Sequence, residues 1–96
     1  MLESKFKSDF RKELKKLGAY FVLQYKQDAT TVSGFPDTIA IFEGICIFIE
    51  FKASKTAKFQ PLQKNQIAKL SDANHFVFVV YPENAGDVLK AIKEII

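Results

Sequence analysis

The sequence predicts an α/β fold in which a mixed central sheet is flanked by helices, with the element order α-β-β-β-α-β-α. Apolar residues recur at helical spacing in residues 2–17 and again from 84 to 96. Short runs rich in Ile, Phe and Val predict four strands. A helix predicted over residues 61–72 separates the third strand from the fourth, which favours a right-handed parallel connection between them.

The first helix is predicted over residues 2–17. It ends at Gly18, because glycine readily adopts the left-handed conformation that terminates a helix. Its apolar face consists of Leu2, Phe6, Phe10, Leu14 and Leu17. The rest of its surface is rich in lysine, which is typical of a helix face in contact with solvent.

The remaining elements follow from turn and capping residues. Strands are predicted over residues 19–26, 37–42, 45–52 and 75–81, with loops at 27–35 and 53–60. Glu43-Gly44 joins the two middle strands as a tight turn. Pro61 suits the first turn of the helix at 61–72. Asn84 and Asp87 resemble a capping box, which predicts that the last helix begins here and runs to Ile96.

The composition is that of a small globular protein, and residues 1–96 are expected to form one domain. The formal net charge of +3 is compatible with a polyanionic partner but does not identify one. The single cysteine, Cys46, cannot form an intramolecular disulfide, and no signal peptide or membrane-spanning run is visible, so we expect a cytoplasmic location. Ten phenylalanines are many for so small an interior, which favours a homodimer with some of these rings at its interface.

Two carboxylates face each other in the predicted hairpin. If Glu43-Gly44 is a two-residue turn, the register places Asp37 opposite Glu50. Side chains so opposed have Cβ atoms about 4.5–5.5 Å apart, and their like charges repel unless a cation lies between them. Lys52 lies two residues beyond Glu50 and therefore on the same face of the strand. A bulged three-residue turn would shift the register by one and separate the carboxylates.

This arrangement predicts a divalent-metal site. Magnesium or manganese suits paired carboxylates, with water filling the remaining coordination positions. Such an ion polarises a phosphoryl oxygen and lowers the pKa of a bound water, which phosphodiester hydrolysis requires. Lys52 would hold or activate the attacking water, or stabilise charge on the phosphate. Each motif alone also has a plain interpretation, since Pro-Asp often links a loop to a strand and Glu-x-Lys is often a solvated pair.

These motifs resemble those of the PD-(D/E)XK nuclease superfamily, and the closer resemblance is to its small phage-type VRR-NUC domains. In those domains a helix with an early glutamate precedes Gly-x-Pro-Asp, then Glu-x-Lys, then a helix that opens with glutamine. The corresponding segments here are Glu3, Gly34-Phe35-Pro36-Asp37, Glu50-Phe51-Lys52 and Pro61-Leu62-Gln63. The resemblance covers nearly the whole chain. It implies a restriction-endonuclease-like core and a single VRR-NUC-like nuclease domain over residues 1–96.

The resemblance also implies a metal-dependent endonuclease that hydrolyses DNA. Asp37, Glu50 and the backbone carbonyl of Phe51 would bind Mg²⁺ or Mn²⁺, and Glu3 would be a direct or outer ligand. Small stand-alone members of the group are often homodimers that cut branched or four-way-junction DNA. A phage or prophage origin within a bacterial cell would fit this resemblance.

Lys52 would be catalytic in such an enzyme, and Gln63 would support the site. Gln66 competes with Gln63 for the supporting role, because the segment from Phe59 to Gln66 is similar to RecU-type Holliday-junction resolvases. Asn74 departs from the glycine usual before the last strand, although asparagine tolerates the same left-handed backbone.

Further DNA contacts are expected in the loops beside the site. Lys55 and Lys58 are candidates for phosphate contacts because their loop directly follows Lys52. Ser33, in the loop before Gly34, is a candidate for contact with the DNA backbone. Two alternatives stay open: a basic α/β module that binds nucleic acid without cutting it, and a structural protein in which Glu50 and Lys52 form a surface pair.

Overall fold

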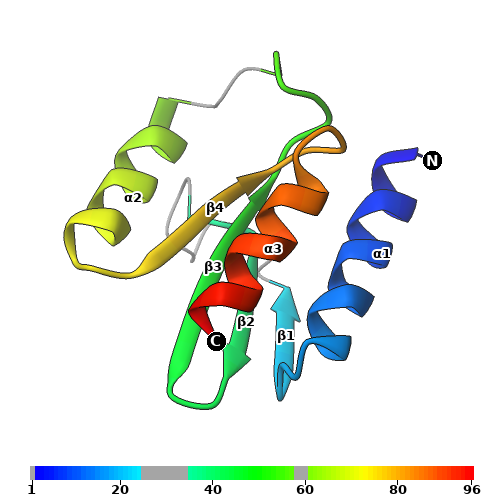
Figure 1. Cartoon of the computed structure of the whole chain (residues 1–96). Coiled ribbons are helices and arrows are strands. Elements are labelled where there is room, and N and C mark those ends of the chain that lie inside the picture. Colours follow the sequence, from blue (N-terminus) through cyan, green and yellow to red (C-terminus); the bar gives the residue numbers. More distant parts are fainter. Residues whose placement is uncertain (1, 25–34, 58–60) are drawn as a thin grey trace.

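The computed structural model of the chain describes residues 2–24, 35–57 and 61–96, apart from the side chains of residues 2–4 and 61 (Figure 1). The elements are α1 (Leu2–Lys16), β1 (Phe21–Gln24), β2 (Thr38–Phe42), β3 (Ile45–Phe51), α2 (Pro61–Asp72), β4 (Phe76–Val80) and α3 (Ala85–Ile95). Their order is the predicted one, and the α/β class with a mixed sheet flanked by helices is confirmed. Within the described residues, no helix has the length and apolar character needed to cross a membrane.

The sheet has the strand order β1-β2-β3-β4. The first two pairs, β1 with β2 and β2 with β3, are antiparallel. The last pair, β3 with β4, is parallel, as predicted from the helix that connects them. Strand β3 is therefore flanked by two neighbours, and it is the element on which the candidate site is built.

The β2–β3 hairpin turns at Glu43-Gly44. The glycine has a φ of 74°, a left-handed conformation that it adopts without steric penalty. At the far end of the hairpin, Thr38 pairs with Ile49. The next pair in the same register is Asp37 with Glu50, so the two-residue turn forms and the bulged alternative does not.

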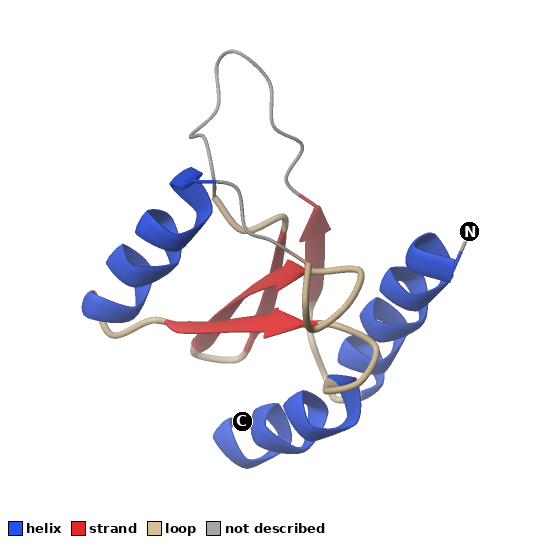
Figure 2. Ribbon diagram, turned by 90° about the horizontal axis from the view of Figure 1, so that it is seen from above, coloured by secondary structure: helices blue, strands red, loops and turns tan. Residues whose placement is uncertain are grey.

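One face of the sheet carries the hydrophobic core. Ile47, Ile49 and Phe51 alternate along β3 and point to this face, where they are buried against α1 and α3. The ring of Phe51 meets those of Phe6 and Phe10 edge-on, with centroids 5.7 and 5.6 Å away. Figure 2 shows α1 and α3 together on this side of the sheet and α2 on the other.

The opposite face of β3 carries Phe48 and Glu50, and α2 covers this face beside β4. Near β1 the same face is open to solvent. Phe21 and Leu23 of β1 point to this face, and they are 58% and 47% exposed. The strand begins two residues later than residues 19–26 predict, and residues 25 and 26 lie outside the described part of the chain.

Gly18 terminates α1 as predicted. Its φ is 112°, its N–H donates to the Lys15 carbonyl (3.0 Å), and the N–H of Ala19 donates to the Leu14 carbonyl (3.2 Å). These are the two hydrogen bonds of a Schellman motif. Asn74 ends α2 in the same way, with a φ of 65°, which explains why asparagine can stand where glycine would be usual.

The capping box predicted at Asn84 and Asp87 is wrong. Asn84 is the N-cap residue of α3, but its side chain makes no capping hydrogen bond. Its Nδ2 donates instead to the carbonyl of Val79 (2.9 Å), and its Oδ1 accepts from the N–H of Tyr81 (2.9 Å). The amide thus pairs with the end of β4 much as the peptide group of a neighbouring strand would. Competition from these two backbone partners is the physical reason for the failed prediction.

Candidate functional site

Four side chains meet at the end of the sheet where β3 finishes. Glu50 is the penultimate residue of β3, and Lys52 follows the strand directly. Asp37 immediately precedes β2, and the hairpin register brings it beside Glu50. Gln63 lies in the first turn of α2. Figure 1 shows that β3 runs toward the end of the sheet where both α1 and α2 begin.

Gln63 bridges the carboxylate and the ammonium group. Its Nε2 donates to Oε2 of Glu50 (2.7 Å), and its Oε1 accepts from Nζ of Lys52 (2.8 Å). Glu50 and Lys52 are only 6% and 9% exposed, so the bridge satisfies polar groups that burial would otherwise penalise. Of the two glutamines proposed to support the site, Gln63 rather than Gln66 is the one that makes these contacts.

Asp37 is attached to Glu50 through its backbone. The N–H of Asp37 donates to Oε1 of Glu50 (3.2 Å). Its carboxylate accepts a hydrogen bond from the hydroxyl of Thr38 (2.9 Å), a residue with no exposed surface. Each carboxylate is therefore held by a protein donor, which restricts its rotation at the end of the hairpin.

The electrostatic environment makes the charged forms of both carboxylates unfavourable. Burial, followed by the negative charge of Asp37, raises the pKa of Glu50 from its ordinary value of 4.5 to about 7, against the opposing charge of Lys52. Burial also raises the pKa of Asp37, while the Thr38 hydroxyl and nearby cations act in the opposite direction. A cation bound by both carboxylates would relieve this repulsion.

The donor set fits a small divalent cation. In the described part of the chain, no three His, Cys, Asp or Glu side chains lie close enough together to hold a metal. Two carboxylates are nevertheless sufficient for Mg²⁺, which keeps several waters and is commonly bound by one or two carboxylates. The N–H of Phe51 hydrogen-bonds the Asp37 carboxylate, so the backbone between Glu50 and Lys52 also borders the place where an ion would bind.

The other predicted site residues lie outside this cluster or outside the described residues. Glu3 belongs to the first turn of α1, but its side chain is among those not described. Ser33 and Lys58 fall in the undescribed segments. Lys55 is exposed in the loop after β3, three residues beyond Lys52.

Three further residues at the site were not predicted from the sequence. Thr38 directly follows Asp37, and its position after a Pro-Asp pair was the only signal available. Lys7 and Arg11 reach from α1 over the ring of Phe51, with Nζ and Cζ 6.0 and 5.3 Å from its centroid. Their four-residue spacing is visible in the sequence, but helical periodicity alone does not say which flank of a lysine-rich helix meets the sheet.

Solved structures with the same architecture exist. A chain described as "VRR_NUC domain protein" superimposes with a TM-score of 0.76 at 18% sequence identity, over 100% of this chain and 88% of the other. The chain therefore has a VRR-NUC-like fold. No protein-family model and no curated protein sequence matches it. The fold implied by the sequence resemblance is thus supported by an observation that does not depend on the motifs.

Proposed function

We propose that this protein is a metal-dependent endonuclease that hydrolyses phosphodiester bonds in DNA. The observation that carries the proposal is the buried network in which Gln63 joins Glu50 to Lys52 beside Asp37. Two carboxylates next to a buried ammonium group suit a reaction in which negative charge shifts on a phosphate. The fold shared with a VRR_NUC domain protein supports the same proposal.

The chemistry requires a cation at the carboxylate pair. Asp37 and Glu50 would hold Mg²⁺ or Mn²⁺, with the carbonyl of Phe51 and the carboxylate of Glu3 as the further proposed ligands. The ion supplies Lewis acidity toward a phosphoryl oxygen and a water molecule. Thr38 and the N–H of Asp37 keep the two carboxylates in place before the substrate arrives.

Lys52 would act on the attacking water or on the phosphate, and Gln63 positions it. Gln63 holds Nζ of Lys52 on the face of β3 that also carries Glu50. The ammonium group is thereby positioned to orient the attacking water or to stabilise charge on the phosphate. Because Lys52 is only 9% exposed as a residue, its charge is screened less than that of a surface lysine.

We further propose that the substrate is branched or four-way-junction DNA and that the enzyme acts as a homodimer in a bacterial cytoplasm, from a phage or prophage. Exposed apolar side chains support self-association, since Tyr20, Phe21 and Leu23 are 62%, 58% and 47% exposed. Two sites in one dimer would allow two strands of a branched substrate to be cut. Lys55, Lys58 and Ser33 are proposed to contact the DNA backbone near each site.

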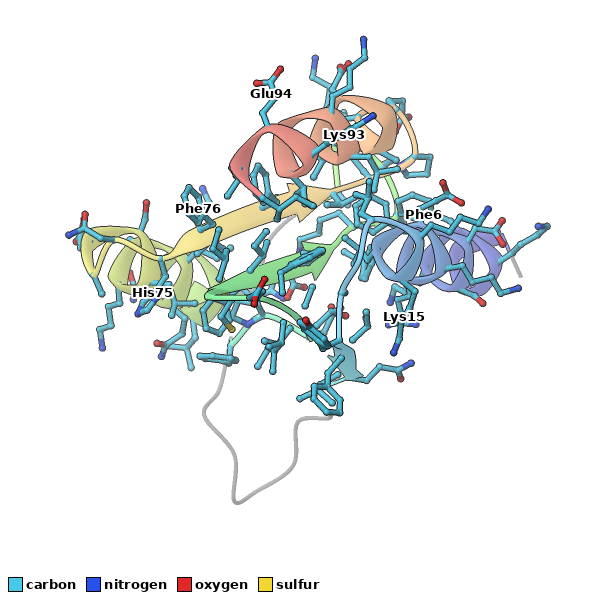
Figure 3. All side chains as sticks on the ribbon, turned by 60° about the horizontal axis from the view of Figure 1, so that its bottom comes forward. Phe6, Lys15, His75, Phe76, Lys93 and Glu94 are labelled. Atoms are coloured by element: carbon cyan, nitrogen blue, oxygen red, sulfur yellow. The ribbon has the colours of Figure 1, made fainter. Side chains whose placement is uncertain are left out.

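A cleavage assay tests the proposed activity. Labelled duplex, single-stranded and four-way-junction DNA are incubated with EDTA, Mg²⁺ or Mn²⁺. We expect cleavage with metal, no cleavage with EDTA, and loss of cleavage in Asp37→Ala and Lys52→Ala. Lys93→Ala is the control, because Lys93 points outward from α3 in Figure 3 and is exposed. Tight DNA binding without cleavage under any metal would favour the non-catalytic nucleic-acid-binding module instead.

A further inference from the structure

Helix α1 carries cations on two flanks, one that faces α3 and one that faces Phe51 at the end of β3. Two cations on the side toward α3 form ion pairs within the helix, Lys5–Asp9 (2.9 Å) and Lys16–Glu13 (3.0 Å), and Lys12 lies on the same side. These residues line the groove between α1 and α3. Lys7 and Arg11 occupy the other flank, four residues apart, and so lie one above the other on the helix surface. This second flank meets the end of the sheet that holds the carboxylates.

Phe51 fixes the position of the second flank relative to the candidate site. Its buried ring lies beneath Nζ of Lys7 at 6.0 Å and Cζ of Arg11 at 5.3 Å. In sequence Phe51 stands between Glu50 and Lys52, and its N–H hydrogen-bonds the Asp37 carboxylate. The charges of Lys7 and Arg11 also act on that carboxylate. Two cations from α1 therefore border the site on the side opposite α2.

The guanidinium of Arg11 has one donor that no described protein group accepts from. Its Nε is inaccessible to solvent, and among the described residues it has no hydrogen-bond partner. A buried donor without an acceptor is unfavourable, and a shift of the half-buried Arg11 side chain would let a ligand oxygen accept from it and relieve the penalty. Arg11 is also the only arginine in the sequence. The planar guanidinium matches the oxygens of a phosphate with paired hydrogen bonds, which a lysine cannot do.

We propose that Arg11, together with Lys7, binds a backbone phosphate of the DNA strand that enters the Asp37–Glu50 site along α1. This inference rests on the proposed function, because it assigns part of the substrate path at the same site. The ligand is a phosphodiester group, which carries no base information. The contact therefore positions the strand and does not select its sequence.

Salt dependence of DNA binding provides the first test. Binding of a short fluorescent duplex is measured in EDTA at several salt concentrations, so that cleavage does not interfere. We expect Arg11→Ala to weaken binding by about tenfold at low salt. The slope of log affinity against log salt should fall in magnitude by about 0.9, the value for one lost phosphate contact.

Lys12→Ala is the matched control, because it removes one positive charge from an exposed position on the groove side of the same helix. We expect a clearly smaller change in both affinity and slope. Equal effects of Arg11→Ala and Lys12→Ala would overturn the inference, since they would show a general charge effect. If the wild-type protein bound no DNA either in EDTA or with Mg²⁺, the proposed function itself would fail.

Arg11→Lys and NMR separate phosphate binding from a structural role of Arg11 above Phe51. Arg11→Lys keeps the positive charge, and we expect it to melt like the wild type but to bind DNA less tightly. Because the sequence contains one arginine, its Nε–H gives one side-chain resonance in the wild-type protein. We expect DNA to shift this resonance. The inference would be overturned if the resonance did not change at saturating DNA. It would also be overturned if a folded Arg11→Lys bound DNA with the affinity and salt slope of the wild type. Either result would leave the proposed function intact.

Discussion

The side-chain amide of Gln63 donates a hydrogen bond to Glu50 across 2.7 Å, although the two residues lie 13 positions apart. The same amide accepts a hydrogen bond from Lys52. The neutral side chain of Gln63 therefore holds both Glu50, in β3, and Lys52, directly after β3, in place. Because both charged groups depend on it, a change at Gln63 should affect folding and activity together.

Gln63→Leu removes the bridge while keeping a side chain of similar bulk. We expect the free energy of unfolding to fall by about 1–3 kcal/mol, because two buried polar groups lose a partner. DNA cleavage should fall by at least about tenfold, since Lys52 is no longer positioned. Urea unfolding and initial cleavage rates measure the two effects. Gln66→Leu, on the same helix and similarly half-buried, is expected to change both much less; equal losses would contradict the bridging role.

Asp37→Asn should stabilise the metal-free protein while abolishing cleavage. The negative charge of Asp37 contributes to the raised pKa of Glu50, so its removal relieves a repulsion between the half-buried Asp37 and the buried Glu50. Asparagine can still accept the hydrogen bond from Thr38. We expect a higher melting temperature in EDTA, equivalent to about 1 kcal/mol. Glu94→Gln, at an exposed position that points outward from α3 in Figure 3, serves as the control. A clear drop in melting temperature would contradict the opposed carboxylates.

The sequence was sufficient to predict the order of elements and the hairpin because the decisive interactions there are local. Glu43-Gly44 fixes the turn, and the two-residue period of the strands then fixes which residues face each other. Asp37 opposite Glu50 follows from these two facts alone. The first turn of α2 was also predictable from Pro61, whereas the place of Gln63 at the site was implied only by the family resemblance.

The remaining features depend on contacts between distant elements, which local patterns do not contain. The amide of Asn84 pairs with β4 because the strand end offers it a carbonyl and an N–H, so it does not cap α3. Arg11 belongs to a helix face that looks solvent-exposed in the sequence, yet it lies over Phe51. In both cases the residue type was compatible with two environments, and tertiary packing selected one of them.

Stability without metal should decrease as pH rises through the titration of Glu50. Its pKa is about 7 in the folded protein against an ordinary value of 4.5, so between these values the folded state binds more protons than the unfolded state. The corresponding stabilisation is present below the unfolded pKa and is lost as pH passes the folded pKa, by up to about 3 kcal/mol. The raised pKa of Asp37 acts in the same direction.

Urea unfolding in EDTA at closely spaced pH values measures this dependence. Glu50→Gln should show a much flatter profile between about pH 5 and about pH 8, because its amide does not titrate. Subtracting the two profiles removes the contribution of groups that both proteins share. If the wild-type protein became more stable over this interval relative to Glu50→Gln, the raised pKa of Glu50 would be incorrect.

Mg²⁺ or Mn²⁺ should stabilise the protein most at the pH where both carboxylates are charged. We expect an increase in melting temperature at about pH 8 and a much smaller one at about pH 5, because protons compete with the metal for Asp37 and Glu50. At a metal concentration about 100 times its dissociation constant, the stabilisation would be about 2.7 kcal/mol. The double variant Asp37→Asn/Glu50→Gln should lose this response, whereas Glu94→Gln should keep it. If metal stabilised the double variant as much as the wild type, the ion would bind elsewhere on the protein, and Asp37 and Glu50 would not be the metal site.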